Sequence, residues 1–175
     1  MHKIGFKVYA GCLFIDGDGA KDLQRNGVDV IQLDVTKEVD WNQAVDHIRG
    51  KTGALWGLVH NAGWSTFGEI EWVGMDTYRR IAEINTFGII LGTQKILPLI
   101  RPNKGRIVTI TSGLVRGAAP SRSPYVFTKY AVVGFIECLR YEMKRFGVQV
   151  HAENMGHVSK SRNSRAIFLL EADAF

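Results

Sequence analysis

Short apolar runs alternate along the chain with longer stretches whose apolar residues recur at helical spacing. The apolar runs, several of them β-branched, predict strands at Phe6–Leu13, Val28–Leu33, Leu55–His60, Arg106–Thr111 and Val148–Ala152. The helical spacing predicts helices at Gly19–Gln24, Val39–Ile48, Asp76–Leu97 and Ser123–Phe146. Because strands that alternate with helices are typical of repeated βα units, we expect an α/β fold with a parallel sheet.

The helix that starts at Ser123 has the clearest boundary signals. Ser123 is expected to cap it, Pro124 suits its first turn, and Gly147 suits the position after its last turn. After Asn154 the pattern becomes polar. The short apolar run Ala166–Leu170 then has no element to pack against in this scheme.

Size and composition fit one globular domain of ordinary character. The chain has 175 residues, of which 46% are hydrophobic and 22% are charged. No apolar run approaches the roughly 18 residues of a membrane helix, and Met1–Ala10 lacks the pattern of a secretory signal. Cys12 and Cys138 fit neither a metal site nor a disulfide framework, and the basic residues are scattered. We expect an intracellular protein with reduced thiols, no metal and no nucleic-acid partner.

Three residues suggest a chemistry. Tyr125 precedes Lys129 by four positions on the expected helix, which puts both side chains on one face. An ammonium near a phenol favours the phenolate form, so the tyrosine can exchange a proton with a substrate. Ser112 ends the strand before that helix. Two hydroxyls aimed at one oxygen suit the oxidation of an alcohol or the reduction of a carbonyl.

The Tyr-x-x-x-Lys spacing is weak evidence by itself, since a tyrosine and a lysine on a helix surface would look the same. Its context strengthens it. Ser112 lies at the carboxyl end of an expected strand, where ligands bind in open α/β sheets. Asn61-Ala62-Gly63 ends the preceding strand at the same edge, and its small residues would let a flat ring approach the backbone.

These residues have the order and spacing of the short-chain dehydrogenases/reductases, and the chain resembles that family over about residues 6 to 158. The matching positions are Asp34 with Val35, Asn61-Ala62-Gly63, Asn85, Ser112, Tyr125 and Lys129. The resemblance implies a partial dinucleotide-binding domain at 1–158 with a Rossmann-like, doubly wound parallel sheet. It leaves 159–175 as a divergent tail.

The resemblance also implies a role for each residue. Tyr125 would be the general acid/base, Ser112 would hold the substrate oxygen, and Lys129 would assist Tyr125 and bind the nicotinamide ribose. Asn85 would keep a helix open to a water that relays protons. The expected cofactor contacts are Asp34, Val35, Asn61, Ala62, Gly63, Tyr125, Lys129 and Val158. For Asp34 the alternative is a carboxylate that only starts a turn.

The chain departs from the family at its first element. The family opens with a strand and a Gly-x-x-x-Gly-x-Gly loop before the helix whose N-terminus receives the pyrophosphate. This sequence has no such loop, and Phe6–Leu13 matches the family's second strand, so we expect a truncated member without the first strand. The absent strand would lie between Phe6–Leu13 and Leu55–His60 and leave two strand edges unpaired. We therefore expect weak or no dinucleotide binding by this chain.

The resemblance implies an oxidoreductase that interconverts a small secondary alcohol and its ketone with NAD, or alternatively NADP. Segments such as Ser65–Glu69 and Cys138–Met143 are similar to the mitochondrial, 3-hydroxybutyrate-oxidising branch of the family. That branch implies 3-hydroxybutyrate and acetoacetate as substrates and a mitochondrial location, with the cytoplasm as the alternative. A carboxylate would need a cation, and Arg116 and Arg122 are the nearest to Tyr125 in sequence, with a solvated surface position as the alternative for either. Retinol or hydroxysteroid substrates and a non-catalytic remnant stay open. The full-length parent is expected to be a homo-oligomer.

Overall fold

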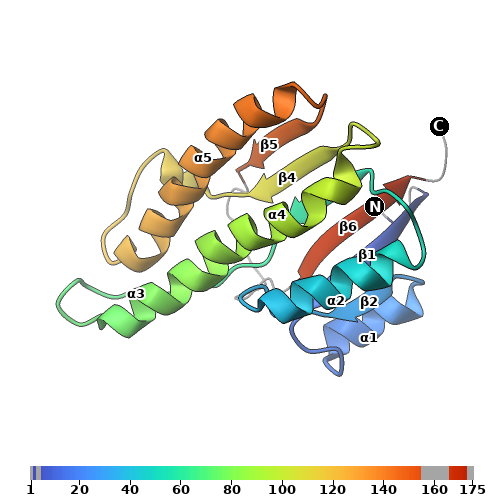
Figure 1. The fold of residues 1–175 in the computed structure, drawn as a ribbon. Helices are drawn as coiled ribbons and strands as arrows, with labels where there is room; N and C mark the ends of the chain where they lie inside the picture. The colour runs from blue at the N-terminus through green and yellow to red at the C-terminus, as the bar shows by residue number, and fades with distance from the viewer. Residues whose placement is uncertain (1, 3–4, 155–165, 173–175) are drawn as a thin grey trace.

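The computed structural model describes residues 2, 5–154 and 166–172. Its elements run in the order β1 (Phe6–Cys12), α1 (Asp18–Arg25), β2 (Asp29–Gln32), α2 (Glu38–Arg49), β3 (Gly57–His60), α3 (Met75–Ala82), a π-helix (Glu83–Phe87), α4 (Gly88–Ile100), β4 (Arg106–Ile110), a 3-10 turn (Gly113–Val115), α5 (Ser123–Lys144), β5 (Gln149–Glu153) and β6 (Ala166–Ala172). The strands form one sheet in the order β2-β1-β6-β3-β4-β5 (Figure 1). The predicted α/β class is confirmed.

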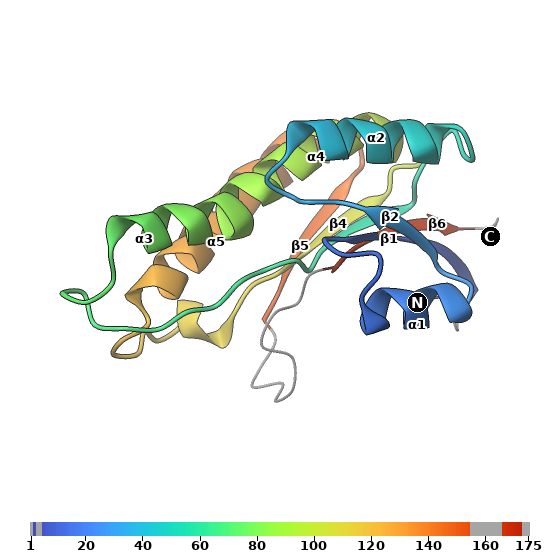
Figure 2. The ribbon, with the colours of Figure 1, turned by 90° about the horizontal axis from the view of Figure 1, so that it is seen from below.

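The helices are distributed unevenly over the two faces of the sheet. The helices α2, α4 and α5 cover one face, and α1 lies on the other (Figure 2). The larger core cluster lies under α2, α4 and α5 and includes Trp41, Ile96 and Ile136, all almost fully buried. A smaller cluster around Val8 and Ala20 lies between the sheet and α1. None of the described helices is long and apolar enough to cross a membrane.

The C-terminal strand corrects two expectations from the sequence. The run at Ala166–Leu170, which had no expected packing partner, belongs to β6 in the interior of the sheet. It pairs antiparallel with β1 from Phe6↔Ala172 to Cys12↔Ala166, and with β3 from Gly57↔Leu170 to Val59↔Phe168. Leu169 is fully buried in the larger core cluster. The two strand edges are therefore paired, and the sheet is mixed although its other pairs are parallel.

The long helix expected at Asp76–Leu97 is not one regular helix. It runs as α3, the π-helix and α4, and Pro98 lies inside the last turn of α4. The expected cap of α5 also differs, because Arg122 is the residue before the helix and Ser123 already belongs to it. The Ser123 hydroxyl instead lies 2.6 Å from the hydroxyl of Tyr78 on α3. Gly147 has a φ of +70°, which confirms the glycine expected after α5.

The contact between α2 and α4 depends on a glycine. A Cβ added at Gly92 on α4 would overlap the ring of Trp41 on α2. The Trp41 indole N–H donates to the carbonyl of Val35 at 3.0 Å, so the ring cannot turn away without losing that bond. The close approach of these helices therefore fixes the turn that carries Asp34 and Val35.

Candidate functional site

The candidate site lies at the carboxyl edge of β3 and β4. These strands are parallel neighbours, and His60 at the end of β3 is level with Thr109 near the end of β4. The segments that follow them, Asn61–Gly63 and Thr111–Ser112, therefore leave the sheet side by side. The helix α5, which has Tyr125 and Lys129 in its first turns, packs against the 3-10 turn that follows Ser112.

Lys129 is nearly buried, with 5% of its surface exposed. Its ammonium donates to the Ile110 carbonyl at 2.9 Å, which ties α5 to the end of β4. The Nζ atom lies 5.7 Å from the centre of the Tyr125 ring one turn earlier. Burial lowers the pKa of Lys129 to about 8, because the charged form loses its hydration. Near neutral pH the amine is still mainly an ammonium and places a positive charge close to the phenol.

Asn85 is fully buried in the π-helix, and its amide is fully used. Its oxygen accepts from the Trp64 N–H at 2.8 Å, and its NH₂ group donates to the Trp64 carbonyl at 2.9 Å. The NH₂ group also donates to the Thr128 hydroxyl at 3.1 Å. Asn85 thus joins the π-helix, the segment after Gly63 and α5. A π-helix inside an α-helix is frequent at functional sites.

Gly63 lies between Asn85 and Lys129. A Cβ at Gly63 would be 3.5 Å from the Asn85 amide oxygen and 3.9 Å from Lys129 Nζ. The structure therefore brings three of the expected residues together at one point. Ala62 beside it is buried, and Asn61 is half-buried.

Thr128 belongs to this cluster although the sequence did not single it out. Its hydroxyl accepts from Asn85 and donates to the Tyr125 carbonyl at 2.7 Å, and its side chain is fully buried. The available signal was a polar residue between Tyr125 and Lys129 in a helix that is otherwise apolar there. Ser112 is half-buried, and its hydroxyl accepts from the Leu114 N–H at 3.2 Å. Within the described residues Ser112 has no hydrogen bond to Tyr125.

Asp34 and Val35 follow β2 and make local contacts. The Asp34 carboxylate accepts from the Thr36 N–H and hydroxyl at 3.0 and 2.7 Å. Burial acts to raise the pKa of Asp34, but the bonds from Thr36 and the nearby charges of Lys37 and Arg80 outweigh it and hold the pKa below its usual value. Val35 is buried and lies close to Ala62 and His60, with no room for a water molecule between them. The Asp34 carboxylate thus makes turn contacts, Val35 lies next to the end of β3, and the cofactor contact expected of Asp34 stays a prediction.

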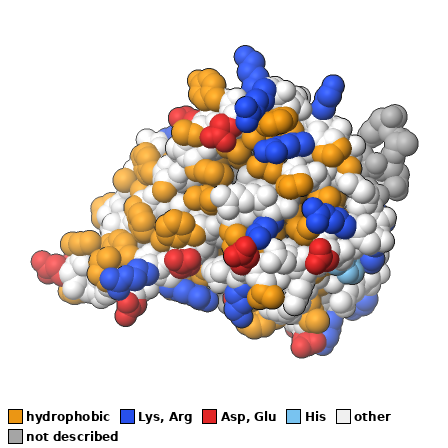
Figure 3. Space-filling view, in the orientation of Figure 1, with side chains coloured by type: hydrophobic (Ala, Val, Ile, Leu, Met, Phe, Trp, Pro, Cys, Tyr) orange, Lys and Arg blue, Asp and Glu red, His pale blue; other side chains and the backbone are white. Residues whose placement is uncertain are grey.

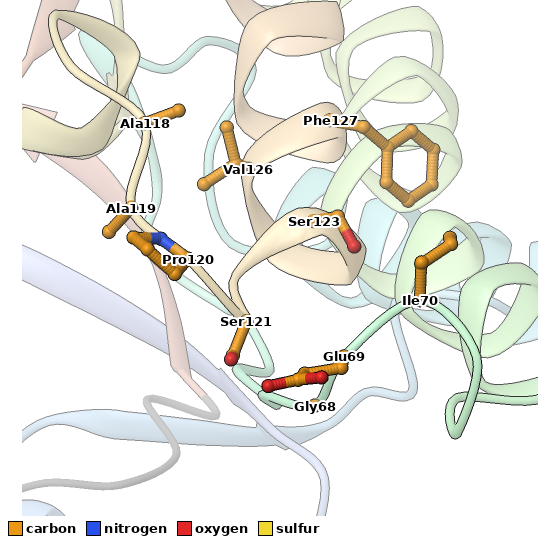
Figure 4. Close-up of a pocket in the computed structure, with 10 residues that line it drawn as sticks. All are labelled: Gly68, Glu69, Ile70, Ala118, Ala119, Pro120, Ser121, Ser123, Val126 and Phe127. Atoms are coloured by element: carbon orange, nitrogen blue, oxygen red, sulfur yellow. The ribbon is translucent and has the colours of Figure 1, made fainter.

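A wider pocket lies beside the first turns of α5. It has a volume of about 550 Å³ and lies between the segment at Gly68–Ile70, the loop at Ala118–Ser121 and α5. Figure 4 shows the side chains of Ile70, Val126 and Phe127 around it, together with the hydroxyls of Ser121 and Ser123 and the carboxylate of Glu69. The loop and the segment are joined by a bond from the Gly68 N–H to the Ser121 carbonyl at 2.8 Å.

The two candidate cations are placed differently. Arg122, three residues before Tyr125, is half-buried. Its guanidinium lies 5.5 Å from the centre of the Phe67 ring. Arg116 is exposed at the end of the 3-10 turn. Val158, the remaining expected cofactor contact, lies outside the described residues.

The residues present fit only one end of a nicotinamide dinucleotide. Lys129, the small residues Ala62 and Gly63, and Tyr125 would face the nicotinamide and its ribose, and the amine has donor capacity beyond its bond to Ile110. The pyrophosphate end has no match among the described residues. There β6 stands next to β1, and the helix after β1 starts with Gly17 and Asp18 rather than a glycine-rich loop.

Comparisons with known proteins bear on this geometry. A family model described as short chain dehydrogenase matches residues 1–168. The mitochondrial D-beta-hydroxybutyrate dehydrogenase of Mus musculus is 45% identical over 166 residues, which cover 90% of this chain and 48% of that protein. The 17-beta-hydroxysteroid dehydrogenase type 6 of Bos taurus is 38% identical over 159 residues, which cover 87% of this chain and 49% of that protein. Retinol dehydrogenase 5 of Mus musculus is 38% identical over 152 residues, which cover 83% of this chain and 47% of that protein.

Solved structures agree with the sequence comparisons. A short-chain dehydrogenase from Streptomyces avermitilis superposes with a TM-score of 0.73 and 27% identity, covering 80% of this chain and 52% of that one. The aldohexose dehydrogenase of Thermoplasma acidophilum gives a TM-score of 0.68 and 29% identity, and the match covers 71% of this chain and 49% of that one. The chain spans about half the length of the curated relatives it matches. From its match to the family model and its identity to these relatives, the chain belongs to the short-chain dehydrogenase family.

Proposed function

We propose that the full-length parent of this chain is an oxidoreductase that interconverts a secondary alcohol and its ketone with NAD or NADP, with Tyr125 as the general acid/base. The observation that carries the proposal is the position of Lys129. Its nearly buried ammonium is fixed to the Ile110 carbonyl and lies one turn from Tyr125, next to Gly63 and Asn85. A buried charge of this kind is unfavourable for stability, and such groups cluster at functional sites.

Each residue then has a chemical task. The Tyr125 hydroxyl gives a proton to the carbonyl oxygen during reduction or takes one from the alcohol during oxidation. The Ser112 hydroxyl donates a second hydrogen bond to the same oxygen, and the Lys129 ammonium stabilises the phenolate that forms. Asn85 holds Trp64, the residue after Gly63, and Thr128 holds the backbone of Tyr125, and the two side chains are joined by a hydrogen bond. The nicotinamide supplies or accepts the hydride.

We propose 3-hydroxybutyrate and acetoacetate as the substrate pair. The mitochondrial D-beta-hydroxybutyrate dehydrogenases of mouse and cattle, 45% and 44% identical to this chain, support that choice. Arg122 supports it too, because it lies three residues before Tyr125 and has no acidic partner in the described part of the chain. Its guanidinium would hold the substrate carboxylate. The same relatives support a mitochondrial location.

A retinol or hydroxysteroid substrate is the second candidate. The apolar pocket of about 550 Å³ between Ile70, Val126 and Phe127 favours it, because a four-carbon acid would leave most of that space unfilled. The retinol and hydroxysteroid dehydrogenases at 38% identity agree with this alternative. The first candidate needs Arg122 to hold the substrate carboxylate, and the second does not need it.

We also propose that the full-length protein is a homo-oligomer. Large apolar side chains are exposed on the helical side, including Phe87 at 54%, Phe127 at 42%, Tyr130 at 49% and Tyr141 at 81%. Figure 3 shows hydrophobic side chains spread over the face that carries α3, α4 and α5. A non-catalytic role is the remaining alternative, and the experiment below separates it from an enzyme.

The decisive experiment uses three variants that the same helix offers. Tyr125→Phe is expected to lose alcohol oxidation and ketone reduction by at least about 100-fold, since it removes the proton donor. Lys129→Met is expected to lose the binding of reduced nicotinamide mononucleotide, measured by its fluorescence. Tyr130→Phe, on an exposed position of α5, is the matched control and keeps both properties. Full turnover by Tyr125→Phe, or no activity in any protein that includes this chain, would contradict the proposal.

The substrate class is tested through Arg122. Assays of 3-hydroxybutyrate and retinol with Arg122→Leu are expected to show a KM for the acid raised at least about tenfold, because a charged hydrogen bond is lost. Activity on retinol should be unchanged. A variant that keeps its KM for 3-hydroxybutyrate would favour the second candidate.

A further inference from the structure

The space between β1 and β3, which we call the slot, is filled by a strand of reversed direction. The parallel strands β1, β3 and β4 all end at the edge of the sheet where the candidate site lies. β6 starts at that edge, because Ala166 pairs with Cys12, and it finishes at the opposite edge, where Ala172 pairs with Phe6. The strand in the slot therefore leads the chain away from the site.

This direction matters for anion binding. A parallel strand in the slot would lead into a helix whose free N–H groups point back at the site, which is the usual support for a pyrophosphate. β6 provides no such helix start. The helices that follow the strands beside the slot are also unsuitable, because α1 has Asp18 in its first turn and α3 has Asp76. Those carboxylates lie at the positive helix ends and repel a second anion.

β6 is held in the slot on both sides. It has a continuous ladder to β1 and a shorter one to β3, and Leu169 is fully buried among the residues under α2, α4 and α5. A segment with two strand neighbours and a side chain in the main core is part of the folded sheet. Its removal would expose two strand edges together.

We propose that the folded chain, with β6 in the slot, does not accept the diphosphate part of a dinucleotide, because neither β6 nor the helices beside it offer a free helix start at the site. The nicotinamide-ribose end of the site stays available beside Lys129 and Gly63. Only the statement that the nicotinamide-ribose end stays available rests on the proposed function. Ligands that carry a diphosphate without nicotinamide test β6, and ligands that carry nicotinamide without a diphosphate test the proposed function.

The first experiment fixes β6 in place. In a Cys138→Ser background, which removes the exposed thiol, Ala166→Cys puts a cysteine opposite Cys12 in the strand register. Oxidation is expected to form the Cys12 disulfide in the folded protein, as detected by mass spectrometry of peptides. Ala172→Cys is the matched control, since it lies at the other end of β6 opposite Phe6, and it should not react with Cys12. Equal cross-linking by both variants, or none by Ala166→Cys, would overturn the placement of β6.

The second experiment measures binding to the cross-linked protein by calorimetry. ADP-ribose is expected to show no saturable binding in the millimolar range, because no helix start receives its diphosphate. Saturable binding of ADP-ribose to the cross-linked protein would overturn the inference. Reduced nicotinamide mononucleotide is expected to bind, and its failure to do so would count against the proposed function while leaving the result for ADP-ribose valid.

Discussion

At the scale of single residues, the site depends on Thr128. Its hydroxyl is shared between the side chain of Asn85 and the backbone of Tyr125, so it couples the π-helix to the start of α5. The side chains of Asn85 and Thr128 are both fully buried, and an unpaired hydrogen-bond donor is unfavourable in such a place. The position of Tyr125 is therefore set by a neighbour that takes no part in the proposed proton transfer.

Removal of this hydroxyl should weaken the fold measurably. Thr128→Val keeps the shape of the side chain but leaves one N–H of Asn85 without its partner, so the free energy of unfolding should fall by about 1–2 kcal/mol. Urea unfolding followed by circular dichroism measures the change. Thr86→Val is the control, because its hydroxyl makes only a 3.4 Å contact with the Thr128 carbonyl, and it should lose less than about 0.5 kcal/mol.

A second buried residue makes stability depend on pH. His60 is 1% exposed, and burial lowers its pKa from 6.5 to about 3. Its Nε2 atom lies 2.9 Å from the Thr93 hydroxyl, which donates to the Ile89 carbonyl, and Nδ1 has no partner in the described structure. The imidazole therefore donates through Nε2 and stays neutral when folded.

The sign of the effect follows from the two pKa values. Above about pH 6.5 both states hold neutral His60, so stability does not change with its titration. As the pH falls from 6.5 toward 3, only the unfolded state takes up the proton, and at pH 5 the folded state has lost about 2 kcal/mol. Urea unfolding of the wild type and His60→Gln between pH 8 and pH 5 measures this. Equal pH dependence in both proteins would exclude His60 as the cause.

At the scale of elements, the sequence predicts most helices and strands because their signals are local. The β-branched run Arg106–Thr111 and the proline and glycine at the ends of α5 are examples, and the structure confirms both elements to within a residue or two. Ser112 and Asn61–Gly63 are found at the predicted strand ends. Their proposed roles stay predictions.

The π-helix and the true start of α5 were not predictable in the same way. The helical spacing of apolar residues continues across Glu83–Phe87, because the one extra residue in a π-helical turn changes that spacing little. Its cause is tertiary, since Asn85 bonds to Trp64 and Thr128 on other segments. Ser123 had the right type for a cap, but its hydroxyl meets Tyr78 on another helix instead.

The contact between α2 and α4 gives a test at this scale. Gly92→Ala would push a methyl group into the Trp41 ring, so the protein should lose about 1–3 kcal/mol of stability. Gly134→Ala on α5 is the opposite case, because nothing lies near its Cβ position and alanine favours the helix by up to about 1 kcal/mol. Thermal unfolding should show a lower Tm for the first variant and a higher one for the second. The same direction of change in both would contradict the packing described.

At the scale of the whole molecule, the sheet order is the feature that sequence patterns could not supply. An apolar run such as Ala166–Leu170 shows that a segment is to be buried, but its place depends on which strand edges are free. The family resemblance did imply two free strand edges, beside Phe6–Leu13 and Leu55–His60, and in the structure the run at Ala166–Leu170 pairs with both of them. The pairing of the C-terminal run with these edges could not be predicted, because strand pairing over so long a sequence distance leaves no local signal.

The placement of β6 can be tested by stability alone. Leu169→Ala should reduce the free energy of unfolding by about 2–5 kcal/mol, since it empties a fully buried position in the core. Ile70→Ala, at a position that is 69% exposed, should change it by less than about 0.5 kcal/mol. Urea unfolding compares them. A loss at Leu169 no larger than that at Ile70 would mean that the segment does not pack in the sheet.

The position of β6 also sets the timing of folding during synthesis. In the described strands, β2 with β1 and β3 with β4 and β5 form two parts of the sheet that only β6 joins. Translation proceeds from the N-terminus, so residues 166–172 are made after the other described strands. On the ribosome, the two half-sheets therefore keep open edges until β6 emerges, and this interval is when the nascent chain most needs protection by chaperones.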